Sequence, residues 1–177
     1  MNRNVVALLI AVGVVLPPAL AAQERVLSIA ASGGLVGSLD EDEGGFSNST
    51  FQARFAVETA RRRLVAVRLG RMDFGDEPVG RASEVTLDYL SLSGEYLFEE
   101  DYYESGLFAG LGLFDLASTR SDGRSGDETA VGLVVGALGE FRLADRWFIY
   151  GEAAFAYTNL DVAQLFADLQ IGVGFRF

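Results

Sequence analysis

The sequence predicts an all-β fold, an eight-stranded antiparallel up-and-down barrel, and three observations support this. Apolar residues alternate with polar residues or glycine at period two, which is the period of a strand. Half of the 177 residues are hydrophobic, yet after residue 22 no apolar run is long enough for a membrane helix. The connecting segments alternate between long and short, as in a meander whose two ends differ.

Turn-forming residues divide the chain into eight expected strands. These are residues 25–37, 50–58, 63–72, 83–97, 104–117, 129–143, 147–157 and 164–177. The mostly long, acidic connections are 38–49, 73–82, 118–128 and 158–163, and the mostly shorter ones are 59–62, 98–103 and 144–146. Four connections at one end and three at the other fit eight strands with both termini on the side of the short turns.

The second and third strands carry their charges on one face. In the second, Phe51 and Phe55 alternate with Arg54, and in the third, Val67 alternates with Arg68. Each of these strands therefore has one apolar face and one polar face.

The fourth strand, 83–97, departs from a uniform alternation. Its apolar positions change parity between Val85 and Leu90. A β-bulge near Tyr89 would bring both halves onto the same face, so we predict a bulge there.

The fifth and sixth strands are rich in glycine, including Gly110, Gly112, Gly132 and Gly136. Glycine inside a strand marks a place where something approaches closely, or else it weakens the strand. The composition therefore indicates either crowding inside a narrow barrel or a less secure strand prediction in this region.

The seventh strand supplies an argument from length. Trp147 and Tyr157 share one face and are ten residues apart. At about 3.3 Å per residue and a tilt near 40°, they are separated along the barrel axis by roughly 25 Å, the height of the apolar band of a membrane barrel. We predict that the two rings belong to aromatic girdles at opposite interfaces, with Tyr96, Phe141 and Phe175 joining Trp147.

The eighth strand ends on Phe177, the last residue of the chain. Gln170, Gly172, Phe175 and Phe177 fall on the polar, glycine and two aromatic positions of the C-terminal signal by which bacterial outer-membrane barrels are recognised by their assembly machinery. By this motif the chain resembles the small outer-membrane β-barrel proteins of the OmpA/OmpX-like kind, the outer membrane protein beta-barrel domain family. The motif covers only the last eight residues, whereas the expected architecture covers the whole mature chain.

The resemblance implies a transmembrane barrel in the cell outer membrane of a Gram-negative bacterium. Its expected partners are outer-membrane lipid and the outer-membrane assembly machinery, and we expect a monomer. The N-terminus fits export through the periplasm, because Arg3, an apolar run over 5–16 and the small residues near Ala21 have the order of a cleaved secretory signal. We therefore expect a signal peptide over residues 1–22 and a barrel domain over residues 23–177.

Composition excludes several functions. All fourteen basic residues are arginine, and loss of Arg3 with the signal leaves 13 against 25 acids, a net charge of −12. Such a charge argues against nucleic acid as a partner. The chain has no cysteine and no histidine, so disulfides and thiolate metal sites are impossible and the most common general base is missing. We expect no enzymatic activity, no catalytic residue and no cofactor.

Two kinds of eight-stranded barrel place their charges oppositely. A soluble, lipocalin-like lipid-binding barrel turns its apolar face inward, whereas a membrane barrel turns it toward lipid. The end-of-strand aromatic residues favour the membrane arrangement. The inward set would then comprise Arg54, Glu58, Arg68, Glu84, Asp88, Glu140, Glu152, Asp168 and Arg176, and we expect Arg54, Arg68, Glu140 and Glu152 to form a salt-bridged plug.

Two charged segments can each be interpreted either as a functional site or as an ordinary exposed segment. The acidic segment 40–45 could bind a divalent cation, but it matches no complete calcium loop, so we predict a solvated loop and no metal site. The basic segment Arg61–Arg63, in the first short turn, could touch anionic lipid head groups or could be an ordinary turn.

The favoured function is a non-enzymatic outer-membrane protein with a structural, envelope-integrity or surface-interaction role. The alternatives are a narrow passive conduit for small or apolar solutes and the soluble lipid-binding barrel.

Replacement of Arg54 and Arg68 together by alanine should leave buried carboxylates without their partners and lower the melting temperature in detergent. The melting temperature would be measured by circular dichroism. If it stayed at the wild-type value, the predicted charge network would not contribute to stability.

Overall fold

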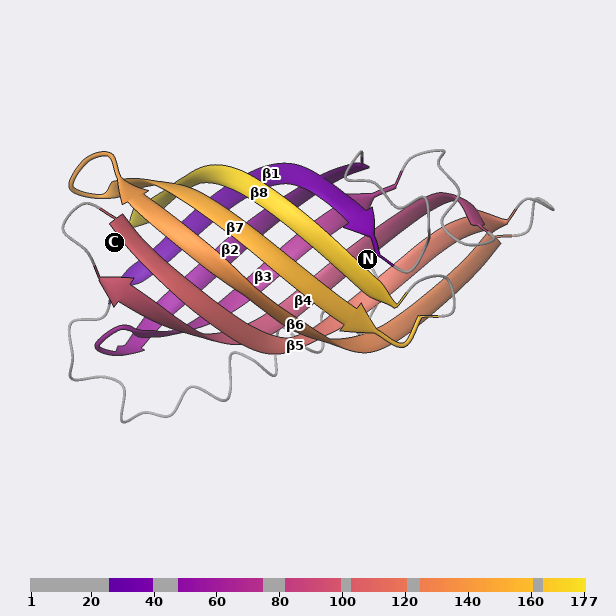
Figure 1. The fold of residues 1–177 in the computed structure, drawn as a ribbon, viewed down its shortest axis with the longest axis horizontal. Helices are drawn as coiled ribbons and strands as arrows, with labels where there is room; N and C mark the ends of the chain where they lie inside the picture. Colours follow the sequence, from indigo (N-terminus) through magenta and orange to yellow (C-terminus); the bar gives the residue numbers. More distant parts are fainter. Residues whose placement is uncertain (1–25, 40–47, 75–81, 100–102, 121–124, 161–163) are drawn as a thin grey trace.

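A computed structural model describes residues 26–39, 48–74, 82–99, 103–120, 125–160 and 164–177; the predicted signal peptide and the acidic segment 40–45 lie outside them. The structure is a single closed barrel of eight strands (Figure 1). The strands are β1 (Leu27–Ser38), β2 (Asn48–Ala60), β3 (Arg63–Asp73), β4 (Ala82–Glu99), β5 (Tyr103–Arg120), β6 (Ser125–Arg142), β7 (Trp147–Thr158) and β8 (Leu165–Arg176). In the described part of the chain, no helix is long and apolar enough to cross a bilayer.

Every strand pairs antiparallel with its neighbours in sequence, and β8 closes the barrel onto β1. The strands are staggered around the barrel. The stagger is found by following register partners from strand to strand, starting at Phe155 on β7. In one direction the partners run through β6, β5, β4, β3 and β2 to Leu27 on β1, and in the other they run through β8 to Gly37, which is also on β1. These two positions are ten residues apart, and a stagger of ten over eight strands gives a strand tilt of about 40°.

The predicted strand order and barrel closure are confirmed. The largest differences are in length, because β5 and β6 extend about three or four residues further toward the connection between them than the alternation indicated. Together with β4 they project past the other strands at the end that carries the long connections, on the right of Figure 1. We call this the loop end. The opposite end, which carries the short connections and the C-terminus, is the turn end.

The apolar face of the sheet points outward and the charges point inward. Ile171 is 68% exposed and Leu111 is 59% exposed, whereas Arg54 is fully buried and Arg68 is 1% exposed. A soluble lipid-binding barrel would have the reverse arrangement, so that alternative is wrong. Hydrocarbon is the solvent that suits such an outer face, and closure leaves no sheet edge unpaired within it.

Exposed aromatic rings gather at the turn end. Trp147 is 52% exposed and packs edge to face against Phe175, with ring centroids 5.0 Å apart, and Phe175 packs in the same way against Phe177. Other exposed rings at this end are Tyr96, Phe98, Tyr103 and Phe141. Tyr157, 54% exposed, lies at the opposite end of β7.

The predicted bulge near Tyr89 is wrong. The pairing of β4 with β5 runs without interruption through Tyr89, and the register shifts only between Ser83 and Val85. The inward face of β4 is apolar near the loop end, at Val85 and Leu87, and becomes polar further down the strand. The change in parity therefore reflects a change in the polarity of the interior and not a change of face.

The glycines of β5 and β6 provide space for aromatic rings inside the barrel. A Cβ on Gly112 or Gly132 would lie within 2.8 Å of the ring of Phe114, and a Cβ on Gly136 would lie within 2.6 Å of Phe108. The crowded interior is thus the correct interpretation of the glycine content, and the strand predictions there hold.

Replacement of Ile171 by arginine tests the outward face. Ile171 lies midway along β8, where a lipid-facing arginine should lower the free energy of unfolding by about 2–4 kcal/mol. The control is Leu39→Arg at the loop end, which should cost about 1 kcal/mol or less because it reaches the interface. Urea unfolding in lipid vesicles gives both values, and equal effects would contradict the proposed membrane position.

Candidate functional site

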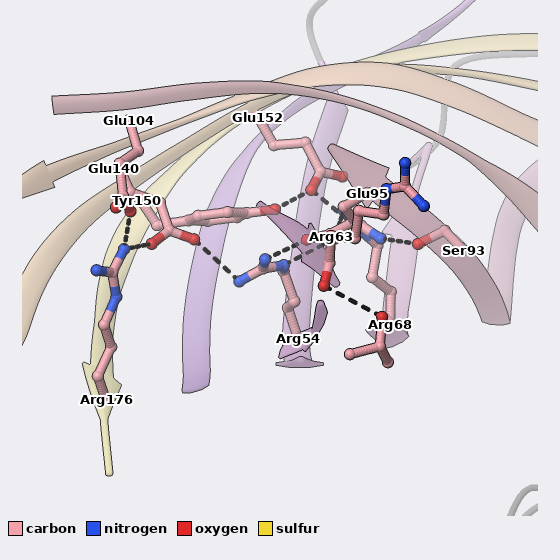
Figure 2. Close-up of polar contacts among 11 residues, drawn as sticks. Arg54, Arg63, Arg68, Ser93, Glu95, Glu104, Glu140, Tyr150, Glu152 and Arg176 are labelled. Atoms are coloured by element: carbon pink, nitrogen blue, oxygen red, sulfur yellow. Dashed lines mark hydrogen bonds and ion pairs between the residues drawn. The ribbon is translucent and has the colours of Figure 1, made fainter. Parts of the chain in front are cut away.

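Seven buried or half-buried charged side chains form one continuous chain inside the barrel, with alternating sign (Figure 2). We call it the lumen ion chain. In order it consists of Glu152, Arg68, Glu95, Arg54, Glu140, Arg176 and Glu104. Each member comes from a different strand, so that every strand except β1 contributes one residue.

Glu95 on β4 is the centre of this chain. One of its oxygens accepts hydrogen bonds from Arg54 Nε at 3.0 Å and from an Arg68 terminal nitrogen at 2.7 Å. Its other oxygen accepts a second bond from Arg54, which makes the Arg54 contact bidentate. Because both arginines and Glu95 are buried, these are charge-assisted bonds in a medium of low dielectric constant.

The chain continues in both directions from this centre. Arg68 donates from Nε to Glu152 at 3.0 Å and from a terminal nitrogen to Ser93 Oγ at 2.5 Å, and Tyr150 donates its hydroxyl to Glu152. Arg54 donates to Glu140 at 3.2 Å. The second oxygen of Glu140 accepts from Arg176, whose guanidinium also contacts Glu104 at the turn end.

Each of the three arginines also lies over an aromatic ring. Arg68 is 3.9 Å from the centroid of Phe108, Arg54 is 5.2 Å from Tyr150, and Arg176 is 5.2 Å from Phe148. A guanidinium over a ring face gains a cation–π attraction that increases when both groups are desolvated. The arginines are therefore held by rings as well as by carboxylates.

A second polar layer lies next to the ion chain on the side of the loop end. Ser32 donates to Gln170 at 2.8 Å, and Gln170 donates from Nε2 to Asp168 at 3.1 Å. Across the lumen, Tyr89 donates its hydroxyl to Gln52 at 2.7 Å. These five residues come from four strands and fill the interior between the charges and the loop end.

A compact apolar core occupies the lumen at the loop end. Phe74 and Phe166 pack with ring centroids 5.6 Å apart, and Tyr89 stacks on Phe114 at 6.0 Å. The fully buried members of this core are Val36, Met72, Phe74, Val85, Leu87, Phe114, Leu160 and Phe166. The lumen is thus charged toward the turn end, polar in the middle and apolar at the loop end.

An open cavity of about 280 Å³ lies at the turn end, below the ion chain. Arg61, Arg62, Glu58 and Arg176 contribute to its lining. Arg62 has a φ of 66°, an uncommon conformation for a residue with a side chain. Among the described residues, no group of three or more acids, histidines or cysteines is arranged to hold a metal ion.

The structure brings together the four residues that the sequence placed in a charge network, since Arg54 contacts Glu140 and Arg68 contacts Glu152. The centre, Glu95, was missed. The sequence did contain a signal for Glu95. It lies three positions after Leu92, an odd number, so it must be on the face opposite the exposed residues of β4.

The expected inward position of Asp88 is wrong. Asp88 is on the outer face and receives two hydrogen bonds from Arg71, at 2.7 and 2.9 Å. The error follows from the predicted bulge, which would have exchanged the inward and outward faces of the first half of β4. The side chain of Glu84 lies outside the described residues.

The residues of the C-terminal motif divide between the two faces of β8. Gln170 is buried in the polar layer, and Gly172 lies where a Cβ would clash with the backbone of Ala31 on β1. Phe175 and Phe177 contact one another in the aromatic cluster of the turn end. This geometry assigns a packing role to each residue, and recognition by an assembly machine stays a prediction.

No protein-family model matches this sequence, and no curated protein matches it. Solved structures do share its fold. Neisserial surface protein A is 16% identical with a TM-score of 0.65, covering 86% of this chain and 97% of that chain. The N-terminal β-barrel domain of OprF from Pseudomonas aeruginosa is 18% identical with a TM-score of 0.61, covering 88% and 98%. Ail, the attachment invasion locus protein of Yersinia pestis, is 19% identical with a TM-score of 0.57, covering 86% and 97%.

The fold is therefore that of the small eight-stranded outer-membrane β-barrels. In these barrels the short turns face the periplasm and the long loops face outward. The turn end of this barrel therefore corresponds to the periplasmic end of those barrels.

Replacement of Glu95 by glutamine should destabilise the barrel by about 3–5 kcal/mol, because two buried guanidiniums lose their shared counter-charge. The matched control is Asp88→Asn, which breaks the exposed pair with Arg71 and should cost less than about 1 kcal/mol. Urea unfolding in lipid vesicles compares the two. A loss at Glu95 no larger than at Asp88 would contradict the central role of this carboxylate.

Proposed function

We propose that the protein is an integral outer-membrane barrel whose rigid, filled wall anchors its surface loops, with a structural or surface-contact role and no enzymatic activity. The observation that carries the proposal is the filled lumen. The ion chain, the polar layer and the apolar core follow one another along the axis. A barrel filled in this way serves as an anchor and leaves little room for a substrate or a solute.

The residues available inside the barrel do not favour catalysis. The chain has no histidine and no cysteine, and the buried carboxylates at the centre of the ion chain are engaged by arginine. A serine hydroxyl needs a nearby base to act as a nucleophile, and the described partner of Ser93 is the guanidinium of Arg68, which is a donor and not a base. These contacts support a structural role for the lumen.

The charge of the loop end restricts the class of partner that we propose for this surface. Ail has been solved in complex with the heparin analogue sucrose octasulfate, a polyanion. The described loop end of the present barrel exposes Asp73, Asp88 and Asp127 and one arginine, Arg71. An acidic surface repels polyanions, so we propose that its contacts are with cationic groups or with anions bridged by divalent cations.

The passive conduit is the less favoured function. The cavity of about 280 Å³ is lined by residues of the turn end, and the apolar core fills the lumen above the polar layer. Ions crossing this core would have to shed their hydration, which is prohibitive in an apolar medium. A conduit would therefore require the apolar core to rearrange.

Reconstitution separates these functions. The purified protein should insert into lipid, as judged by a shift in gel mobility between heated and unheated samples, and should give no steady single-channel current in planar bilayers. A general porin reconstituted in the same bilayers serves as the positive control. Steady openings would favour the conduit, and recovery as a monodisperse protein in buffer without detergent would refute the membrane assignment.

A further inference from the structure

Among the described residues, the two ends of the barrel expose side chains of opposite net charge. Among the described side chains that are exposed at the turn end, four are arginines and one is an aspartate, a net charge of +3. We call the four arginines Arg61, Arg63, Arg142 and Arg146 the basic rim. At the loop end the described exposed charges are Arg71 with Asp73, Asp88 and Asp127, a net charge of −2. The chain as a whole is strongly acidic, so a basic rim at one end is a local feature that its composition does not explain.

The basic rim lies at the level of the aromatic girdle. Arg63 is the register partner of Tyr96, and Arg146 immediately precedes Trp147. Tyr103, Arg142, Arg146 and Trp147 contribute to the lining of one crevice at the edge of the barrel, which also contains the carboxylates of Glu104, Glu140 and Asp145. Because tyrosine and tryptophan on membrane barrels mark the head-group region, these guanidiniums lie at the depth of lipid phosphates.

The residues of the basic rim lie on two opposite sides of the barrel. Arg61 lies in the turn between β2 and β3, and Arg63 is the first residue of β3. Arg142 is the last residue of β6, and Arg146 lies in the connection between β6 and β7, which is four strands away in a barrel of eight. Backbone bonds fix the second connection, since Leu143 N–H donates to the carbonyl of Trp147 at 2.9 Å and Arg176 N–H donates to that of Arg146 at 2.8 Å. Within the described residues, no ion pair engages the side chains of Arg63, Arg142 or Arg146.

We propose that the basic rim is a binding site for the phosphates of anionic phospholipids in the periplasmic leaflet of the membrane. Guanidinium groups bind phosphate oxygens through paired N–H donors, and basic residues at an anionic surface gain an attraction that a zwitterionic lipid does not supply. The proposal rests on the membrane placement given above. It adds a lipid preference, and it assigns that preference to four named residues.

The test compares lipid retention by variants. Wild-type protein is inserted into vesicles of phosphatidylcholine mixed with phosphatidylglycerol and extracted in mild detergent, and the retained lipids are counted by native mass spectrometry. Wild type should retain phosphatidylglycerol preferentially, and the variant carrying Arg61→Gln, Arg63→Gln, Arg142→Gln and Arg146→Gln should lose the preference, by about fivefold for each arginine removed. The matched control carries Asp73→Asn and Asp127→Asn at the loop end and should retain the preference.

Two further measurements distinguish a failure of the membrane placement from a failure of the basic rim. The heat-dependent gel shift reports insertion, so a wild-type protein that fails to insert refutes the membrane placement, whereas one that inserts without lipid preference refutes only the basic rim. High salt should abolish the preference of wild type without any substitution, because it screens the attraction. If the fourfold variant does not fold, this salt dependence decides the question, and a preference that resists salt or survives the four substitutions overturns the proposal.

Discussion

The constraint on which the rest of the structure depends is the pairing of charge inside a barrel surrounded by lipid. A guanidinium transferred out of water costs several kcal/mol unless carboxylates and hydrogen bonds compensate it. Arg54 and Arg68 obtain that compensation from Glu95, Glu140 and Glu152, which lie 27 to 86 residues away along the chain. These partners meet only when the sheet closes with its stagger of ten. A slip of one residue in β2 or β3 would turn the arginines toward hydrocarbon, so the ion chain specifies the register.

The interior is layered because the two ends of the barrel meet different surroundings. At the loop end the apolar core of Phe74, Phe114 and Phe166 resembles the core of a small soluble domain and holds the projecting ends of β4, β5 and β6. Toward the turn end the lumen is filled by charges that satisfy one another. The barrel therefore needs no cysteine staple, because backbone closure, buried ion pairs and a packed apolar core act at different heights along the axis.

The alternation of the sequence was sufficient to predict eight strands, their order and the outward face, because period two is unambiguous in β2, β3, β7 and β8. It also selected Arg54, Arg68, Glu140 and Glu152 as inward charges. It failed in β4, where the rule that one face is uniformly apolar does not hold, and the resulting bulge turned Asp88 inward and hid Glu95. Which arginine pairs with which carboxylate in the lumen ion chain could not be predicted at all. The pairing depends on the stagger, which brings residues of seven strands together and has no local signal in the sequence.

The low identity to the neighbouring structures indicates where function resides in such a barrel. Chains that are 16–19% identical to this one share its fold over at least 86% of its length. The wall therefore tolerates nearly any sequence that keeps apolar residues outside and a satisfied interior, and sharing the wall says little about activity. What distinguishes one such barrel from another must lie in the groups exposed at its two ends. Among the described residues, one end exposes mostly acidic and the other mostly basic side chains, and we propose that this polarity, more than the lumen, selects what the protein contacts.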